Sequence, residues 1–340
     1  MMAELSGGRN RSYTARRYHG PTSHVNPRWR PVVAVLPVVA LIAGGWGFYA
    51  IWHTYASELH GASAGLRPSW LIAASVLWLA TYVQLILLWA ASFPWWGSRI
   101  QWFDGLRVFT LTNLTRYIPG TVWQFAGLAG MAKAAGASAV ASSVGVILLQ
   151  IVTLATGFAI CLSATPRLLG SWAQDMSTNQ QLLLAAALVA LLVVAMPRLL
   201  PWIRRWTERV LKKPLPLPVP PTGPFAMYAV RVSLGWVGYG LAFWMLTHAL
   251  LGDAAPSAWV AVTSYVASYM VGLLAVLAPG GLVVREGALV VLLTPSIGAQ
   301  PALLMALAAR LWQVGLEVVA ALAVVAVDAV RRRRALARGA

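Results

Sequence analysis

The chain has 340 residues, of which 59% are hydrophobic and only 10% are charged. Because a soluble domain carries about 25% charged residues, this composition excludes an ordinary soluble domain and predicts an integral membrane protein. The net charge of +17 does not indicate nucleic acid as a partner, because 17 of the 26 basic residues border apolar segments, in 1–31, 198–213 and 331–338. Basic clusters beside membrane spans are what the positive-inside rule expects on the cytoplasmic side.

Apolar runs of about 20 residues, the length that a helix needs to cross a bilayer, recur along the chain. We predict an all-α, polytopic membrane bundle of about eight spans over residues 32–330, between basic cytoplasmic tails at 1–31 and 331–340. The seventh span is unusually short. The spans are expected near 32–54, 69–92, 137–162, 180–197, 226–250, 257–277, 283–297 and 301–328.

Residues 99–133 are too apolar for a solvated loop, but they also carry Asp104, Arg107 and Arg116. A helix from 102 to 116, a Pro-Gly break and a helix from 121 to 133 would form a re-entrant hairpin with both ends at the cytoplasmic face. Non-helical backbone at membrane depth is tolerated only where protein or a water-filled cavity covers it. The break therefore predicts a cavity.

The loop 198–224 is basic and proline-rich, which predicts that it is cytoplasmic. Its first part, "LLPWIRRWTERVLKK", is typical of an amphipathic helix on the membrane surface, followed by a stiff extended linker. Eight spans place both termini in the cytoplasm, so we expect a multi-pass protein of the cell membrane.

A second broken segment lies at 278–298 and begins "APGGLVVREG". Its "PGGLVVREGAL" aligns with "PGTVWQFAGL" of the first break if one residue is skipped, which indicates a possible internal repeat. Interrupted spans in corresponding positions of two halves are a sequence pointer to the binding site of a transporter.

A half-helix that begins after Pro-Gly directs unpaired backbone N–H groups and its positive dipole end into the gap. Such an end favours an anion, and Arg116 and Arg285 lie beside the two breaks. The phosphate of a lipid headgroup is the expected occupant. Alternatively, both breaks are kinks packed by neighbouring helices, and Arg116 extends to the membrane surface.

The last span carries Arg310 and Glu317, which a helix places on nearly the same face. Charges within a span usually face the bundle interior. Glu286 would pair with Arg310 or Arg231 while Arg285 faces a ligand; a buried ion pair that only fixes helix register is an equal alternative. The candidate substrate-binding residues are Arg116, Tyr117, Pro119, Gly120, Trp123, Gln124, Pro279, Gly280, Gly281, Arg285, Glu286, Arg310 and Glu317.

The two motifs resemble those of the flippase-like membrane region of lysylphosphatidylglycerol synthases. That family shows "[KR]Y-[IL]-PG-x" and "PGG-x-G-x-REG", and this chain has "RYIPGT" at 116–121 and "PGGLVVREG" at 279–287. Val283 stands where the family usually has Gly. The resemblance implies a protein that binds or moves anionic or lipid-linked substrates. The aminoacyl-transferring domain of the synthases has no counterpart in this sequence, so the resemblance does not extend to the synthase reaction.

We therefore predict a lipid flippase or transporter that is not an enzyme and uses no cofactor or metal. Its partners are expected to be membrane lipids, phospholipid or polyprenyl-phosphate in type; oligomerisation stays open. One alternative is an accessory membrane subunit that presents lipid to a partner. The other is a polyprenyl-phosphate-dependent glycosyltransferase, which the absence of an Asp-x-Asp motif and of spaced histidine ligands disfavours.

Overall fold

The computed structural model describes residues 66–117, 122–164, 176–211, 220–274 and 284–339. The regular structure of these residues is helical throughout, as the predicted all-α class requires. The N-terminal tail and the first predicted span, near 32–54, lie outside the described residues. The remaining seven predicted spans each coincide with a helix.

Five of these helices contain a stretch long and apolar enough to cross a membrane, which fits an integral membrane protein. Two further helices, α8 and α9, are shorter, and α9 has only 14 residues. The number of crossings and their orientation stay predictions. The seven helices are α2 (Pro68–Ala91), α5 (Ala139–Ala164), α6 (Thr178–Leu211), α7 (Thr222–Leu251), α8 (Ala258–Leu274), α9 (Val284–Ile297) and α10 (Ala299–Gly339).

The segment predicted as a hairpin contains two helices, α3 (Trp102–Asn113) and α4 (Val122–Ala134), as expected on either side of the Pro-Gly break. A 3₁₀ turn at Leu114–Tyr117 continues α3 toward residues 118–121, which lie outside the described residues. The two helices pack against one another. Their membrane depth, and hence re-entry, stays a prediction.

The basic segment after the fourth predicted span differs from the prediction. Residues 198–211 do not form a separate surface helix but are the last turns of α6, which runs for 34 residues through Pro197 and Pro201. Each proline removes one backbone hydrogen bond. Arg198 and Arg205 each donate from the guanidinium group to the carbonyl oxygen four residues earlier, at 2.6 and 3.3 Å.

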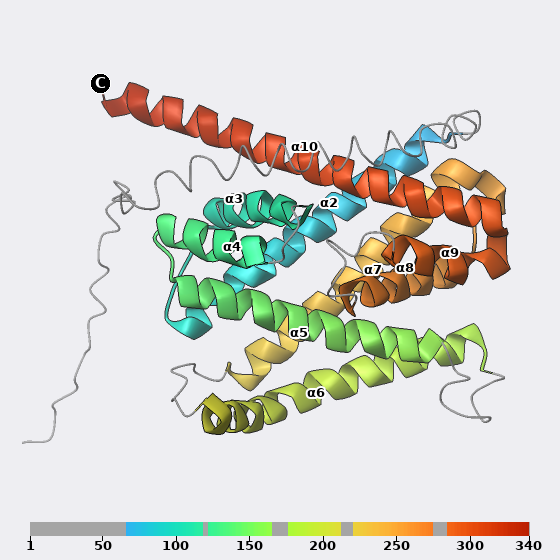
Figure 1. Ribbon diagram of the computed structural model, residues 1–340, viewed down its shortest axis with the longest axis horizontal. Helices are drawn as coiled ribbons and strands as arrows, with labels where there is room; N and C mark the ends of the chain where they lie inside the picture. Colours follow the sequence, from blue (N-terminus) through green and yellow to red (C-terminus); the bar gives the residue numbers. More distant parts are fainter. Residues whose placement is uncertain (1–65, 118–121, 165–175, 212–219, 275–283, 340) are drawn as a thin grey trace, which may run out of the picture.

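Two antiparallel helices, α2 and α7, form the centre of the bundle (Figure 1). At one end the backbone N–H of Arg67 donates to the carbonyl oxygen of Ala249 at 2.9 Å. At the other end the rings of Trp95 and Phe225 lie 6.3 Å apart. Between them the ring centroids of Trp78 and Tyr239 are separated by 5.5 Å. The two helices therefore run side by side over their whole length.

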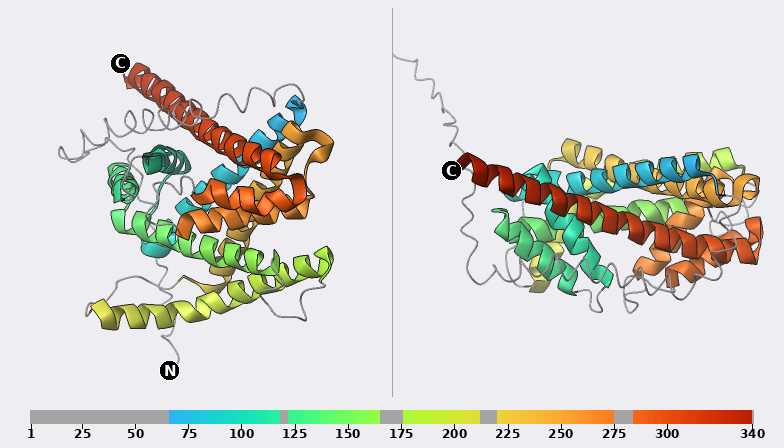
Figure 2. Two further views of the ribbon diagram at one scale, coloured as in Figure 1. Left: turned by 45° about the vertical axis from the view of Figure 1, so that its right-hand side comes forward. Right: turned by 90° about the horizontal axis from the view of Figure 1, so that it is seen from above.

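The other helices pack around this pair in two matching series. In the first series α2 packs on α3, α3 on α4 and α4 on α5; in the second, α7 packs on α8, α8 on α9 and α9 on α10. The contacts between the series also match. The second helix of each series packs on the last helix of the other: α3 on α10, and α8 on α5. The first helix of each series packs on the last helix of its own series: α2 on α5, and α7 on α10. Among the described helices, α6 alone lies outside this scheme, against α5 and α7, at the margin of the bundle (Figures 1 and 2).

The turns of the two series match as well. A 3₁₀ turn follows α2 at Phe93–Trp96 and another follows α7 at Gly252–Ala254. Each short helix joins its long helix through a glycine with positive φ, which L side chains rarely adopt: Gly136 (φ 82°) between α4 and α5, and Gly298 (φ 85°) between α9 and α10. The same order of elements thus occurs twice.

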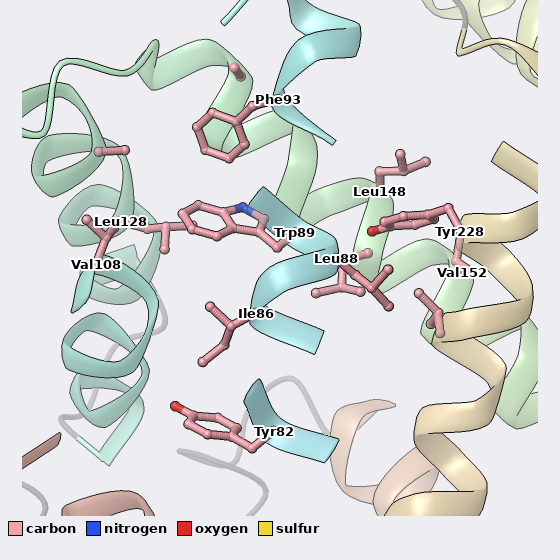
Figure 3. Close-up of a cluster of buried hydrophobic side chains, with 14 of the residues drawn as sticks. Tyr82, Ile86, Leu88, Trp89, Phe93, Val108, Leu128, Leu148, Val152 and Tyr228 are labelled. Carbon is pink, nitrogen blue, oxygen red and sulfur yellow. The ribbon is translucent and has the colours of Figure 1, made fainter. Parts of the chain in front are cut away.

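The main apolar core lies where α2 meets the α3–α4 pair and α5. Figure 3 shows the ring of Trp89 directed toward Val108 and Leu128, while Leu88 extends on the other side of α2 toward Leu148. Trp89 is fully buried and donates from Nε1 to the carbonyl oxygen of Ser142 at 3.1 Å. This packing fixes α3 and α4 against the first long helix.

Candidate functional site

A buried chain of polar side chains links α9 to α10. Arg285 lies in the first turn of α9, and its Nη1 donates to Oε1 of Gln313 at 2.7 Å. Gln313 in turn donates from Nε2 to Oε1 of Glu317 at 3.0 Å, one turn further along α10. The exposed fractions of the three residues are 7%, 4% and 1%. Arg285 and Glu317 are therefore joined through one amide group, away from the outer surface.

Two tyrosine rings of α8 flank the guanidinium group. The Cζ atom of Arg285 lies 5.0 Å from the ring centroid of Tyr265 and 5.1 Å from that of Tyr269. Contacts at this range are favourable cation–π interactions, and more so where water is excluded. The spacing of four residues places both rings on one face of α8. The two rings and Gln313 together surround the guanidinium group.

A glycine on α8 permits this arrangement. A Cβ atom at Gly272 would lie 2.8 Å from Cβ of Arg285, closer than real Cβ contacts come. Gly272 is buried. The absence of a side chain there allows the first turn of α9 to lie against α8, which places Arg285 between Tyr265 and Tyr269.

A second charged pair joins the same two helices. Nε of Arg310 on α10 lies 3.4 Å from Oε1 of Glu286 on α9, and the exposed side-chain fractions are 4% and 15%. Of the two partners expected for Glu286, the structure brings Arg310 to it, whereas Arg231 is exposed on α7. The pair joins α9 to α10. The alternative interpretation, in which a buried ion pair only fixes helix register, expects a contact of this kind.

The four charges of this cluster cancel formally. Arg285 and Arg310 carry two positive charges, and Glu286 and Glu317 carry two negative charges. A cluster in a low-dielectric interior is far less costly when its charges balance than when one is in excess.

A second buried polar contact lies beside the end of α3. Tyr82 on α2 accepts a hydrogen bond from Nδ2 of Asn113 at 3.3 Å. Asn113 is the last residue of α3, so this contact lies next to the 3₁₀ turn that carries Arg116.

The structure gives different amounts of information on the predicted site residues. Arg285, Glu286, Arg310 and Glu317 are brought together, as described above. For four others it gives only the backbone: Arg116 and Tyr117 lie in the 3₁₀ turn after α3, and Trp123 and Gln124 lie in the first turn of α4. The remaining five lie outside the described residues: Pro119, Gly120, Pro279, Gly280 and Gly281.

Sequence reasoning missed the groups that surround Arg285. Neither Gln313 nor Tyr82, Asn113, Tyr239, Tyr265 and Tyr269 is among the predicted site residues. The spacing of Tyr265 and Tyr269 on one helical face was a usable signal. In the described residues no group of three or more His, Cys, Asp or Glu side chains is arranged to hold a metal ion.

Comparisons of the chain with protein-family models, with curated proteins and with solved structures give no match. The resemblance to the flippase-like region of the synthases therefore rests on the two sequence motifs alone.

Proposed function

We propose that the chain is a membrane transporter that binds the phosphate of an anionic or lipid-linked lipid at Arg285 and moves it between leaflets. The observation that carries this proposal is the placement of Arg285: a buried guanidinium group in the first turn of a short helix that follows a Pro-Gly segment. The planar fork of arginine matches phosphate oxygens, and the positive end of the helix adds to the attraction for an anion.

The two matching helix series support a transporter with an internal repeat. Because α2 and α7 run antiparallel and lead into series with the same order of contacts and turns, we infer that the halves have inverted topology. Inverted repeats are a common architecture of secondary transporters, in which the substrate site lies at the interface between the repeats. The buried contacts Gln313–Glu317 on α10 and Tyr82–Asn113 on α2 and α3 come from the two series and support a polar site of this kind.

In this proposal the α3–α4 pair and the α8–α9 pair are equivalent elements, each interrupted where the motif carries Pro-Gly. The first pair is re-entrant and contributes Arg116, and the second contributes Arg285. Transport proceeds by rocking of one half against the other, so that the headgroup site opens to each leaflet in turn. The acyl or isoprenoid chains stay in the bilayer during this movement.

A reconstitution experiment tests the proposal. The full chain is placed in phosphatidylcholine vesicles that contain a trace of fluorescently labelled phosphatidylglycerol, and the label in the outer leaflet is destroyed by a membrane-impermeant reductant. Transport is expected to expose the inner-leaflet label, with much less exposure for labelled phosphatidylcholine.

The matched control is Arg67→Ala, which removes an exposed arginine at the end of the bundle, and it should transport like the unmodified chain. Arg285→Ala should not transport. If vesicles with the unmodified chain behave like protein-free vesicles for both lipids, the transporter proposal is wrong, and an accessory role that presents lipid to a partner becomes the better interpretation.

A further inference from the structure

We infer that Glu317 is a proton-binding site linked to anion binding at Arg285, so that the anion and a proton bind together. This inference rests on the proposed function. Its basis is the chain Arg285–Gln313–Glu317, in which one amide group touches both the anion-binding guanidinium group and a buried carboxylate.

The amide of Gln313 has its orientation fixed by its neighbours. Arginine has only donors, so the carbonyl oxygen of Gln313 must face Arg285. An ionised carboxylate has only acceptors, so the NH₂ group must face Glu317. Glu317 is the acceptor of this hydrogen bond, a role that an ionised carboxylate fills.

An anion at Arg285 favours protonation of Glu317. Gln313 is the one residue between the guanidinium group and the carboxylate, so a bound phosphate monoanion would bring a second negative charge close to Glu317 in a buried site. A nearby like charge in a low-dielectric interior disfavours the ionised form of a carboxyl group. One proton from the aqueous phase on Glu317 removes this repulsion, and no other bond is made or broken.

Protonation also changes the hydrogen bonds of the bridge. The hydroxyl of a protonated Glu317 can donate to the carbonyl oxygen of Gln313, which requires that the amide rotate. The NH₂ group would then face Arg285, and two donors would meet. Nη1 of Arg285 would lose its acceptor and become available to a phosphate oxygen.

Glu317 is the carboxylate that the amide bridge joins to Arg285, among several charged and titratable groups of the interior. On α9, Arg285 reaches it through Gln313, and Glu286 is engaged by Arg310 of α10. Tyrosines face the interior from the other elements: Tyr82 from α2, Tyr239 from α7, and Tyr265 and Tyr269 from α8. On α3, Asp104 and Arg107 lie beside Asp328, 11 residues further along α10 than Glu317.

The test measures proton uptake during binding. The purified full chain in neutral detergent is titrated calorimetrically with short-chain phosphatidylglycerol, in two buffers of different ionisation enthalpy, between about pH 5 and pH 8. We expect binding to take up protons. Where Glu317 is ionised in the free protein, affinity should rise as pH falls, by up to about tenfold per pH unit for one proton.

Glu317→Gln imitates the protonated carboxyl group. It should bind the probe at every pH with the affinity that the unmodified chain has at low pH, and without proton uptake. Gln313→Met removes both the acceptor of Arg285 and the donor to Glu317. Without that donor, Glu317 should already be protonated in the free protein, so binding of the probe should again take up no proton. The matched control, Asp253→Asn, removes a carboxylate that is 95% exposed and should keep the proton uptake.

The outcomes separate this inference from the proposed function. Binding by the unmodified chain without proton uptake overturns the inference and leaves the anion site intact. Proton uptake that persists in Glu317→Gln also overturns it, because another group then takes the proton. If neither the unmodified chain nor Glu317→Gln binds the probe at any pH, the anion site and the inference both fail.

Discussion

The backbone N–H of Ser138 donates a 2.9 Å hydrogen bond to the side-chain oxygen of Ser98. Ser98 precedes α3 and Ser138 follows α4, so the chain returns to its starting point after both helices. A segment that returns in this way begins and ends at the same side of a bilayer, whatever depth its middle reaches. The bond fits the predicted hairpin, whose place in the membrane stays a prediction.

The first prediction concerns sidedness. With the basic ends in the cytoplasm, a cysteine at Arg209 should be inaccessible from outside the cell, whereas one at Gln300 should be labelled by an impermeant maleimide. Both positions are exposed at helix ends. Labelling of intact cells after Cys161→Ser, with permeabilised cells as the control, measures this. External labelling of the Arg209→Cys variant would contradict the orientation.

The second prediction concerns the shape of the guanidinium group. Arg285→Lys keeps the charge but loses the planar fork that matches phosphate, so it should weaken binding of short-chain phosphatidylglycerol. Arg285→Ala should weaken it further, by about 2–3 kcal/mol, the range for hydrogen bonds to charged groups. Calorimetric titration gives both affinities. Equal binding by all three proteins would exclude Arg285 from the headgroup site.

The third prediction concerns the ion pair of α9 and α10. Arg310→Met leaves the carboxylate of Glu286 without its cation, which should lower the free energy of unfolding by about 3–5 kcal/mol. The double variant Arg310→Met with Glu286→Gln should recover most of that loss, since no charge is stranded. Thermal and denaturant unfolding in detergent measure the cycle. A double variant as unstable as Arg310→Met would show that Arg310 stabilises the fold in another way.

The fourth prediction concerns Gly272. An alanine there would force α9 away from α8, because its Cβ and the Cβ of Arg285 would collide at 2.8 Å and neither atom can rotate aside. We expect lower transport and a lower unfolding temperature, with helix content unchanged by circular dichroism. Gly287→Ala is the control on α9, since nothing lies within 4 Å of its added Cβ. It should retain transport.

Much of the helical framework could be predicted from the sequence. The second span, expected at 69–92, is the helix Pro68–Ala91, and the two helices around residues 118–121 begin and end close to their expected positions. Apolar run length and Pro-Gly pairs are local signals, and they determine where a helix can begin and end. The continuation of α6 through Pro197 and Pro201 was missed because a proline weakens a helix without always ending it.

The arrangement of the site could be predicted only in part. The charges on α9 and α10 were identifiable because charged side chains are rare within apolar spans. The hydrogen bond from Arg285 to Gln313 and the rings of Tyr265 and Tyr269 around it were not identifiable. Those contacts depend on which helices lie next to one another and on their rotation, and neither is recorded in the periodicity of a single segment.

Helix α10 has mechanical consequences for the two halves. Near Gln313 it is fastened to α9, and near Asp328 it is fastened to α3, where Arg107 lies 3.2 Å from the carboxylate and Arg331 lies over the ring of Phe103. The 15 residues from Gln313 to Asp328 span about 22 Å of continuous helix. Helix α10 therefore connects α9 to α3 through one continuous rod, so the positions of these two helices are mechanically coupled.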